Sequence, residues 1–255
     1  MTNIILCGCG GRMGQAIVRA TEQSDALRVV AGIDVNADAV SPVCAFPVYG
    51  NISEFPGSAD VIVDFSHHTA LPSLLDYAVR TGTPLVVSTT GHTEEETKMM
   101  KDASEKVAIF FSRNMSIGIN LLIELAKSAA KTLGVAFDVE IVEKHHNQKL
   151  DAPSGTALMI AEAIAEEREE SEFVYDRHAV RKKRESSEIG IHSIRGGTIV
   201  GEHDAIFAGK DEIITISHTA TSREVFAEGA LRAAAYLAGK GAGLYNMSDL
   251  IHEQA

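Results

Sequence analysis

Residues 143–157 hold the densest group of side chains in the sequence that could carry out acid–base chemistry. Two adjacent histidines, His145 and His146, follow an apolar stretch, and Lys149 comes shortly after them. A histidine can donate a proton near neutral pH, and a lysine supplies a positive charge. The Ser-Gly-Thr sequence at 154–156 then starts a helix pattern, and free N–H groups at a helix start attract a carboxylate. The segment predicts a site that binds an anionic substrate and protonates it.

Adjacent histidines also have simpler interpretations. A metal pair is one, but His145 and His146 lack the i, i+4 spacing of the H-E-x-x-H motif, and no third ligand is evident. We therefore expect no metal site. Two histidines exposed on the surface, without a chemical role, are the remaining alternative to catalysis.

A glycine-rich turn near the start of the chain forms a second candidate site. The sequence GCGGRMG at 8–14 directly follows the apolar run Ile4–Cys7 and opens a helix pattern. Backbone N–H groups at such a helix start, approached closely because of the glycines, can bind a pyrophosphate. The turn departs from strict G-x-G-x-x-G, since Met13 takes the last position and the glycine moves to Gly14. A tight strand-to-helix turn without a ligand is the alternative interpretation.

Other polar residues are spaced as a nucleotide site requires. Asp34 ends the second apolar run, where an acid can accept hydrogen bonds from the adenosine ribose. The segments 88–91 and 112–115 follow the fourth and fifth apolar runs. Open parallel sheets bind ligands at the carboxyl ends of their strands, so these segments should lie together there.

The elements that position these residues follow from the spacing of apolar runs. In the first half, expected strands alternate with expected helices, which indicates a parallel sheet covered on both faces. The strands are expected at 4–7, 27–33, 61–65, 85–87 and 107–111, and the helices at 12–21, 70–80 and 94–106.

The second half has a different pattern. Strands in succession without intervening helices suggest a mixed or antiparallel sheet. Helices are expected at 119–133, 158–168 and 224–237, and strands at 136–142, 189–194, 199–208 and 212–218. The fold class is therefore α/β, with an N-terminal Rossmann dinucleotide-binding domain built on a parallel sheet and a second α+β domain with a mixed open sheet. The expected boundaries are 1–116 for dinucleotide binding, 117–223 for substrate binding and oligomerisation, and 224–255 for a segment that returns to the first domain.

Composition and charge restrict the class of protein. The formal net charge is −12, which disfavours binding to nucleic acid or to an anionic membrane. Basic residues within 177–184 are interpreted as a solvated loop. The three cysteines form no CxxC pair, and no run of about 18 apolar residues suggests a membrane span. We expect a soluble, cytoplasmic protein.

The longest motif resembles a known family. The run HHNQKLDAPSGTA at 145–157 is similar to the signature of the 4-hydroxy-tetrahydrodipicolinate reductase (dihydrodipicolinate reductase) family of diaminopimelate and lysine biosynthesis. The resemblance extends over essentially the whole chain. It includes GCGGRMG at 8–14, DFS at 64–66, STTG at 88–91, RNMSIGIN at 113–120, VGEH at 200–203 and SHTATSREVFAEGA at 217–230.

That resemblance implies an oxidoreductase that reduces a cyclic unsaturated dicarboxylate with hydride from NADH or NADPH, after the 4-hydroxyl leaves as water. It implies His145 as the general acid and Lys149 as a second proton donor, with His146, Gly155 and Thr156 holding the substrate carboxylates. It also implies a homotetramer. The residues that the resemblance implies for dinucleotide binding are Gly8, Cys9, Gly10, Gly11, Arg12, Met13, Asp34, Ser88, Thr89, Thr90, Ser112, Arg113, Asn114 and Met115.

Asp34 and its neighbour suggest which cofactor is preferred. A 2′-phosphate would bring negative charge close to the Asp34 carboxylate, and the next residue is Val35, not an arginine. Arg12 in the glycine turn could pair with that phosphate instead. We therefore expect both cofactors to be used, with a bias toward NADH.

The sequence departs from the family pattern at Ser88, where a glycine is common, and at His67 and His68, where an Arg or Pro-like pair is expected. His67 and His68 are interpreted as helix-start residues near the cleft, and His203 as either a core strand histidine or a ligand; the functional roles of all three stay open. Two other functions compete with the reductase. One is another small-acid NAD(P) dehydrogenase; a semialdehyde enzyme would need a catalytic cysteine, and the three cysteines lie in the nucleotide half. The other is a Rossmann redox-sensing module, for which no DNA-recognition domain is evident.

Overall fold

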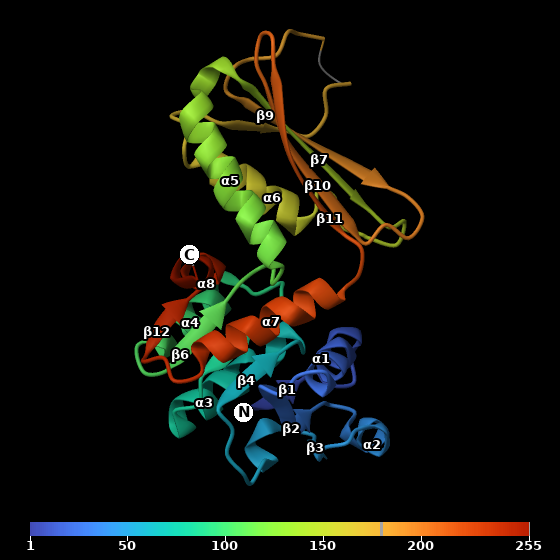
Figure 1. Ribbon diagram of the computed structural model, residues 1–255, viewed down its shortest axis with the longest axis vertical. Coiled ribbons are helices and arrows are strands. Elements are labelled where there is room, and N and C mark those ends of the chain that lie inside the picture. Colours follow the sequence, from blue (N-terminus) through green and yellow to red (C-terminus); the bar gives the residue numbers. More distant parts are fainter. Residues whose placement is uncertain (179–180, 255) are drawn as a thin grey trace. The chain divides into compact units, whose positions relative to one another are not determined.

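The computed structural model describes residues 1–178 and 181–254, which form two compact units (Figure 1). The first unit comprises Met1–Ile117 and the segment that begins at Arg223; the second is Gly118–Ser222. No helix within the described ranges is long and apolar enough to cross a membrane.

The first unit is built on a parallel sheet with the strand order β12-β6-β5-β4-β1-β2-β3. The order reverses between β1 and β4, so the crevice between their carboxyl ends is the place where such sheets bind ligands. The strands are β1 (Thr2–Cys7), β2 (Leu27–Ile33), β3 (Val48–Tyr49), β4 (Val61–Asp64), β5 (Leu85–Val87), β6 (Ala108–Phe111) and β12 (Gly243–Tyr245). The expected parallel sheet is confirmed; β3 and β12 were not expected.

Helices cover both faces of this sheet because successive strand residues point to opposite sides. Ile4 and Leu6 face the core under α1, α7 and α8, whereas Ile5 and Cys7 face the core under α3 and α4. The helices are α1 (Arg12–Glu22), α2 (Ala37–Val40), α3 (Leu71–Thr81), α4 (Glu94–Ser104), α7 (Glu224–Leu237) and α8 (Met247–Gln254). The C-terminal segment thus supplies part of the core of the first unit (Figure 1).

The second unit contains a mixed sheet with the order β11-β10-β7-β9-β8. β7 pairs parallel with β9 and antiparallel with β10, which places β7 at the centre. The strands are β7 (Asp138–His145), β8 (Glu172–Val174), β9 (Glu188–Arg195), β10 (Gly201–Ala208) and β11 (Ile213–Ala220), and the helices are α5 (Ile117–Leu133) and α6 (Gly155–Ala165). The predicted fold class is therefore confirmed.

The alternation along β7 fixes which residues face α5 and α6. Val139 and Ile141 pack with these helices in the core. Glu143 and His145 continue the same phase and are also buried, at 0% and 8% exposure. Two ionisable groups therefore stand at core positions where the strand ends, next to the start of α6.

The basic segment that was interpreted as a solvated loop makes internal ion pairs. Arg177 pairs with Glu188, and Arg184 binds Glu140 and Asp138. Residues 179–180, which this interpretation included, lie outside the described residues. Arg177 and Arg184 therefore neutralise acidic residues on the strands of the second unit itself.

Candidate active site

The glycine turn after β1 has the close backbone packing that a dinucleotide site needs. Gly8 has φ +76°, and a Cβ there would lie 2.5 Å from the Phe65 carbonyl oxygen. A Cβ at Gly14 would lie 2.2 Å from the Gly8 carbonyl oxygen. Only glycine fits either position. The turn ends at Gly11, the N-cap of α1, and presents the start of an eleven-residue helix, where the N–H groups and the helix dipole can stabilise an anion.

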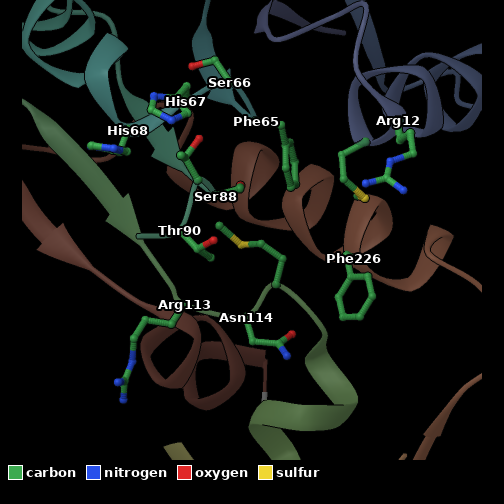
Figure 2. A pocket seen from close by; sticks show the side chains of 13 residues that line it. Arg12, Phe65, Ser66, His67, His68, Ser88, Thr90, Arg113, Asn114 and Phe226 are labelled. Carbon is green, nitrogen blue, oxygen red and sulfur yellow. The ribbon is translucent and has the colours of Figure 1, made fainter. Parts of the chain in front are cut away.

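Two adjoining cavities lie at the carboxyl edge of the sheet. The first, of about 590 Å³, is surrounded by the start of α1 and the segments that follow β4, β5 and β6 (Figure 2). The second, of about 480 Å³, lies on the β2 side and includes Asp34. Phe65, Ser66 and His67 line both cavities. A dinucleotide has two halves joined by a pyrophosphate, and the paired cavities beside a helix start fit that shape.

The Asp34 carboxylate is held by backbone N–H groups. Oδ2 accepts from Gly10 N at 2.9 Å, and Oδ1 accepts from Asn36 N at 3.0 Å. The following residue, Val35, is 91% exposed. The carboxylate is thereby fixed at the wall of the second cavity, the position expected for contact with a ribose.

A buried acid ties two of the surrounding segments together. Asp64, 1% exposed at the end of β4, accepts hydrogen bonds from Ser66 and from Thr89 Oγ1, the latter at 2.8 Å. Burial raises the pKa of Asp64, and the hydrogen bonds from Ser66 and Thr89 oppose that rise. In the sequence, Asp64 stands out only as part of the DFS motif at 64–66. A carboxylate at a buried strand end is the signal that marks its positioning role.

The structure places most of the expected cofactor residues around these cavities. Those that line a cavity are Gly8, Gly11, Arg12, Met13, Asp34, Ser88, Thr89, Thr90, Arg113, Asn114 and Met115. Cys9 is fully buried, Gly10 binds Asp34 through its N–H, and Ser112 is buried with its hydroxyl 2.7 Å from the Asn114 carbonyl oxygen. These three support the turn and the loop from behind the cavity walls.

Several residues that line the first cavity had no role assigned from the sequence, among them His67, His68 and Phe226 (Figure 2). His67 caps a short 3-10 helix, His68–Ala70: its Nδ1 lies 3.4 Å from Thr69 N. His68 Nδ1 lies 2.9 Å from Glu96 Oε1, which joins this helix to the start of α4. The interpretation of both histidines as helix-start residues near the cleft is confirmed, and the His-His sequence itself was the available signal.

In the second unit, the histidine that begins the long motif is anchored through one ring nitrogen. His145 Nδ1 lies 2.6 Å from Glu143 Oε2. Arg195 binds both oxygens of the same carboxylate, with Nη1 to Oε2 at 2.7 Å and Nη2 to Oε1 at 2.6 Å. Ser154 N donates to Oε1 at 3.1 Å. The Glu143 carboxylate therefore links β7, β9 and the start of α6.

Charge explains why a fully buried carboxylate is tolerated. Burial opposes ionisation of Glu143, but hydrogen bonds from His145 and Arg195 outweigh it and hold the pKa well below its ordinary value. The Glu143 carboxylate in turn raises the pKa of Arg195. An ionised carboxylate can only accept, so His145 Nδ1 carries the proton of this hydrogen bond. Nε2 is then the atom through which His145 can exchange a proton.

A second histidine flanks the first. His203 on β10 is 4% exposed, and its ring lies 5.2 Å from the His145 ring, edge to face. Its Nε2 lies 3.0 Å from Ser154 Oγ, which also caps α6 by accepting from Ala157 N. Burial, aided by the charge at His145, lowers the pKa of His203 to about 3, so its ring is neutral. Of the two interpretations, a buried strand histidine describes this placement.

The remaining expected substrate residues lie around the start of α6. Lys149 Nζ is 2.9 Å from Asp151 Oδ1, and that carboxylate is 58% exposed at its side chain. Such an exposed ion pair is weak, so Lys149 can exchange Asp151 for a ligand carboxylate. Gly155 is exposed, and a Cβ built there meets nothing within 4 Å, which leaves space above the first N–H groups of the helix. Thr156 follows it, and His146 begins the turn that carries Lys149.

Comparison with known proteins identifies the family. The family model described as "Dihydrodipicolinate reductase, N-terminus" matches residues 2–115, and that described as "Dihydrodipicolinate reductase, C-terminus" matches residues 118–251. The chain belongs to the dihydrodipicolinate reductase family. Within that family, it is 52% identical over 252 residues to 4-hydroxy-tetrahydrodipicolinate reductase of Caldanaerobacter subterraneus subsp. tengcongensis, covering 98% of both chains. It is 49% identical over 252 residues to the enzyme of the same name from Clostridium novyi, again over 98% of both.

A solved structure of the dihydrodipicolinate reductase family agrees. Dihydrodipicolinate reductase from Paenisporosarcina sp. TG-14, solved with dipicolinate bound, aligns with a TM-score of 0.79 and 27% identity over 96% of this chain and 97% of that one. The resemblance noted in the sequence is thereby confirmed, together with the Rossmann sheet and the second mixed sheet.

Proposed function

We propose that this chain catalyses the NAD(P)H-dependent reduction of 4-hydroxy-tetrahydrodipicolinate to tetrahydrodipicolinate, with loss of water. The two curated relatives at 49–52% identity carry the name of this activity. The balanced reaction consumes the substrate, one NAD(P)H and one proton, and yields tetrahydrodipicolinate, NAD(P)⁺ and water. The single observation that carries the proposal is that His145 is anchored at Nδ1 by Glu143, whose carboxylate also binds the start of α6.

Each unit of the chain has its own part in this proposal. The cavities and glycine turn of the first unit hold the dinucleotide, which supplies a hydride when bound. The second unit holds the dicarboxylate: N–H groups at Gly155 and Thr156, with His146, bind its carboxylates. Lys149 adds positive charge, which a substrate dianion needs in a chain with net charge −12.

Acid catalysis completes the reduction. Hydride addition leaves negative charge on the ring, and His145 delivers a proton from Nε2 to neutralise it. Lys149 is the second proton donor. Water leaves with the 4-hydroxyl and one ring hydrogen, so each turnover consumes one proton in all. Whichever of the two side chains gives that proton recovers it from solvent after product leaves, since neither Lys149 nor the turn around it is buried in the core.

Cofactor preference is part of the proposal. His67 is the one side chain able to carry positive charge among the described residues that line the Asp34 cavity. Arg12 lines the other cavity. We expect both cofactors to be used, with NADH preferred.

The assembly and location of the enzyme are also proposed. β11 is an edge strand of the mixed sheet, and it exposes Ile213 and Ile214 at 68% and 37%. An apolar edge strand favours pairing with another copy. We propose a homotetramer joined through this sheet, working in the cytoplasm; light scattering of the purified enzyme tests the assembly.

The function is tested by supplying freshly generated 4-hydroxy-tetrahydrodipicolinate and following oxidation of NADH and NADPH. Turnover by the wild type and its loss in His145→Gln support the proposal. A small-acid dehydrogenase would instead turn over a 2-hydroxy acid or semialdehyde, and a redox-sensing module would bind NADH without turnover. Either result, with no activity on the dicarboxylate, contradicts the proposal.

A further inference from the structure

Three adjacent strands bring ionisable side chains to one end of the helix-covered face of the mixed sheet. β9 and β7 pair so that Arg195 stands beside His145, and β10 and β7 pair so that His203 stands beside Glu143. Glu143 and Arg195 are not among the residues that the proposed function assigns to the cofactor, the substrate or proton transfer. Glu143 nevertheless contacts His145 Nδ1, the ring nitrogen opposite the proposed proton donor Nε2, and Arg195 binds the same Glu143 carboxylate.

The geometry points to Glu143 and Arg195 as a pair of positioning residues for His145, an inference that rests on the proposed function. Glu143 fixes the proton of the neutral imidazole on Nδ1, which leaves Nε2 as the atom that gives and regains a proton. Arg195 neutralises the Glu143 carboxylate, so that the protonated imidazole is held without being stabilised so strongly that it keeps its proton.

The hydrogen-bond count at Glu143 supports the first half of this inference. Oε2 is shared by His145 Nδ1 and Arg195 Nη1, and Oε1 by Arg195 Nη2 and Ser154 N. With both oxygens occupied by donors and the side chain 0% exposed, no rotation can offer His145 a different partner. Packing at this depth holds the imidazole in one orientation and one tautomer.

The second half follows from the charges that face His145. β7 contributes Glu143, β9 contributes Arg195, and β10 contributes His203, whose ring is neutral. The following turn contributes Lys149 and Asp151, which pair with each other.

Arg195 Nη2 also donates to the Asp151 carbonyl oxygen at 2.7 Å, which ties that turn to the same guanidinium. The charges around His145 therefore come in neutral pairs. Removing one member of the Glu143–Arg195 pair leaves a net charge next to His145, the proposed general acid.

The tests use the alkaline limb of the pH profile of kcat/KM, where the general acid loses its proton. Glu143→Gln leaves the positive guanidinium beside His145, so the limb should move to lower pH by ~1–3 units. Arg195→Gln leaves the carboxylate alone, so the limb should move to higher pH. The double variant carries neither charge, so its limb should return toward the wild-type position.

The tautomer supplies a readout that does not depend on turnover. In Glu143→Gln, Arg195 binds the amide oxygen and the amide NH₂ faces His145, which drives the neutral ring to the Nε2–H form. Imidazole ¹⁵N shifts of His145 should change from the Nδ1–H to the Nε2–H pattern. The kcat should fall by ~10–100-fold, the loss typical when the hydrogen-bond partner that orients a metal-ligating histidine is removed.

The same strand offers matched controls. Glu140 on β7 binds His192 and Arg184 at 2.8 and 3.0 Å, a similar trio far from the proposed acid. Glu140→Gln and Arg184→Gln should leave the limb and the His145 shifts unchanged. Arg195→Lys, which keeps the positive charge, should keep the limb near wild type while kcat falls.

Any one of three results overturns the inference. The alkaline limbs of Glu143→Gln and Arg195→Gln could move in the same direction, or the His145 tautomer could stay unchanged in Glu143→Gln. The third is a Glu143→Gln protein that is unfolded by circular dichroism while Glu140→Gln is folded. If the wild type shows no reductase activity but Glu143→Gln still switches the tautomer, the proposed function fails and the positioning pair stands. Alkaline limbs that shift in opposite directions in the two variants, together with a tautomer switch in Glu143→Gln, support the inference.

Discussion

Removing the charge of Asp34 should increase the use of NADPH. The carboxylate is held at the cavity wall by Gly10 N and Asn36 N at 2.9 and 3.0 Å, so it cannot turn away from an incoming 2′-phosphate. Two unit charges 4 Å apart repel by ~1 kcal/mol in bulk water and ~4 kcal/mol at an effective dielectric of 20. Asp34 is partly exposed, so the repulsion lies between these limits.

That repulsion predicts a wild-type preference for NADH of ~10–100-fold in kcat/KM, since each 1.4 kcal/mol changes affinity tenfold. Asp34→Ala should lower kcat/KM with NADH, because the ribose loses its acceptor, and raise it with NADPH. Asp34→Asn should raise NADPH use while retaining more NADH activity, because the amide oxygen still accepts.

The assay measures kcat/KM for both cofactors at one fixed ionic strength and again at high salt, where screening should narrow the wild-type preference. Asp38→Ala is the matched control: it removes the same charge from the exposed helix α2, outside the cavity, and should leave the cofactor ratio unchanged. A wild-type preference for NADPH, no gain for NADPH in Asp34→Ala, or an equal gain in Asp38→Ala would refute the reasoning.

Three further predictions concern the acid, the turn and acid stability. His145→Gln should mainly lower kcat, by ~10²–10⁴-fold, whereas Lys149→Ala should also raise KM; near wild-type steady-state kinetics in both would contradict the assignment. Gly8→Ala should abolish cofactor binding or lower Tm, because its Cβ would lie 2.5 Å from the Phe65 carbonyl oxygen; calorimetry with NADH checks both. The pKa of His203 is lowered from 6.5 to about 3, so the unfolded chain takes up this proton first and stability falls as pH drops from 6.5 toward 3. His203→Gln should lose less Tm than the wild type over that range; an identical loss would disprove the cause.

Periodicity was sufficient to predict the architecture. The run 85–87 coincides with β5, which is buried along its whole length and is therefore apolar throughout. The run 27–33 coincides with β2, although Arg28 within it is exposed. The strand expected at 136–142 was too short, since β7 continues to His145. Its last inward positions are occupied by Glu143 and His145, and polar residues there end the hydrophobic pattern before the strand ends.

Some elements gave no local signal. β12 is three residues long and β3 two, and each is defined by its pairing with β6 or β2. Arg195 lies 52 residues from Glu143 along the chain, so only strand register brings the two together. The motif at 145–157 could be read from the sequence, but the residues that orient its first histidine could not.

The most direct test of the central claim follows the two hydrogens added to the ring. The wild type is supplied with 4-hydroxy-tetrahydrodipicolinate and NADH deuterated at the transferred position, and then with ordinary NADH in D₂O; the product is examined by NMR. The account predicts one deuterium from the cofactor at one ring carbon and one stereospecific deuterium from solvent at the neighbouring carbon. In His145→Gln, product should form more slowly in both experiments. A product without deuterium from the cofactor, or no product while NADH is bound, would contradict the claim that this chain is a hydride-transferring reductase with His145 as its acid.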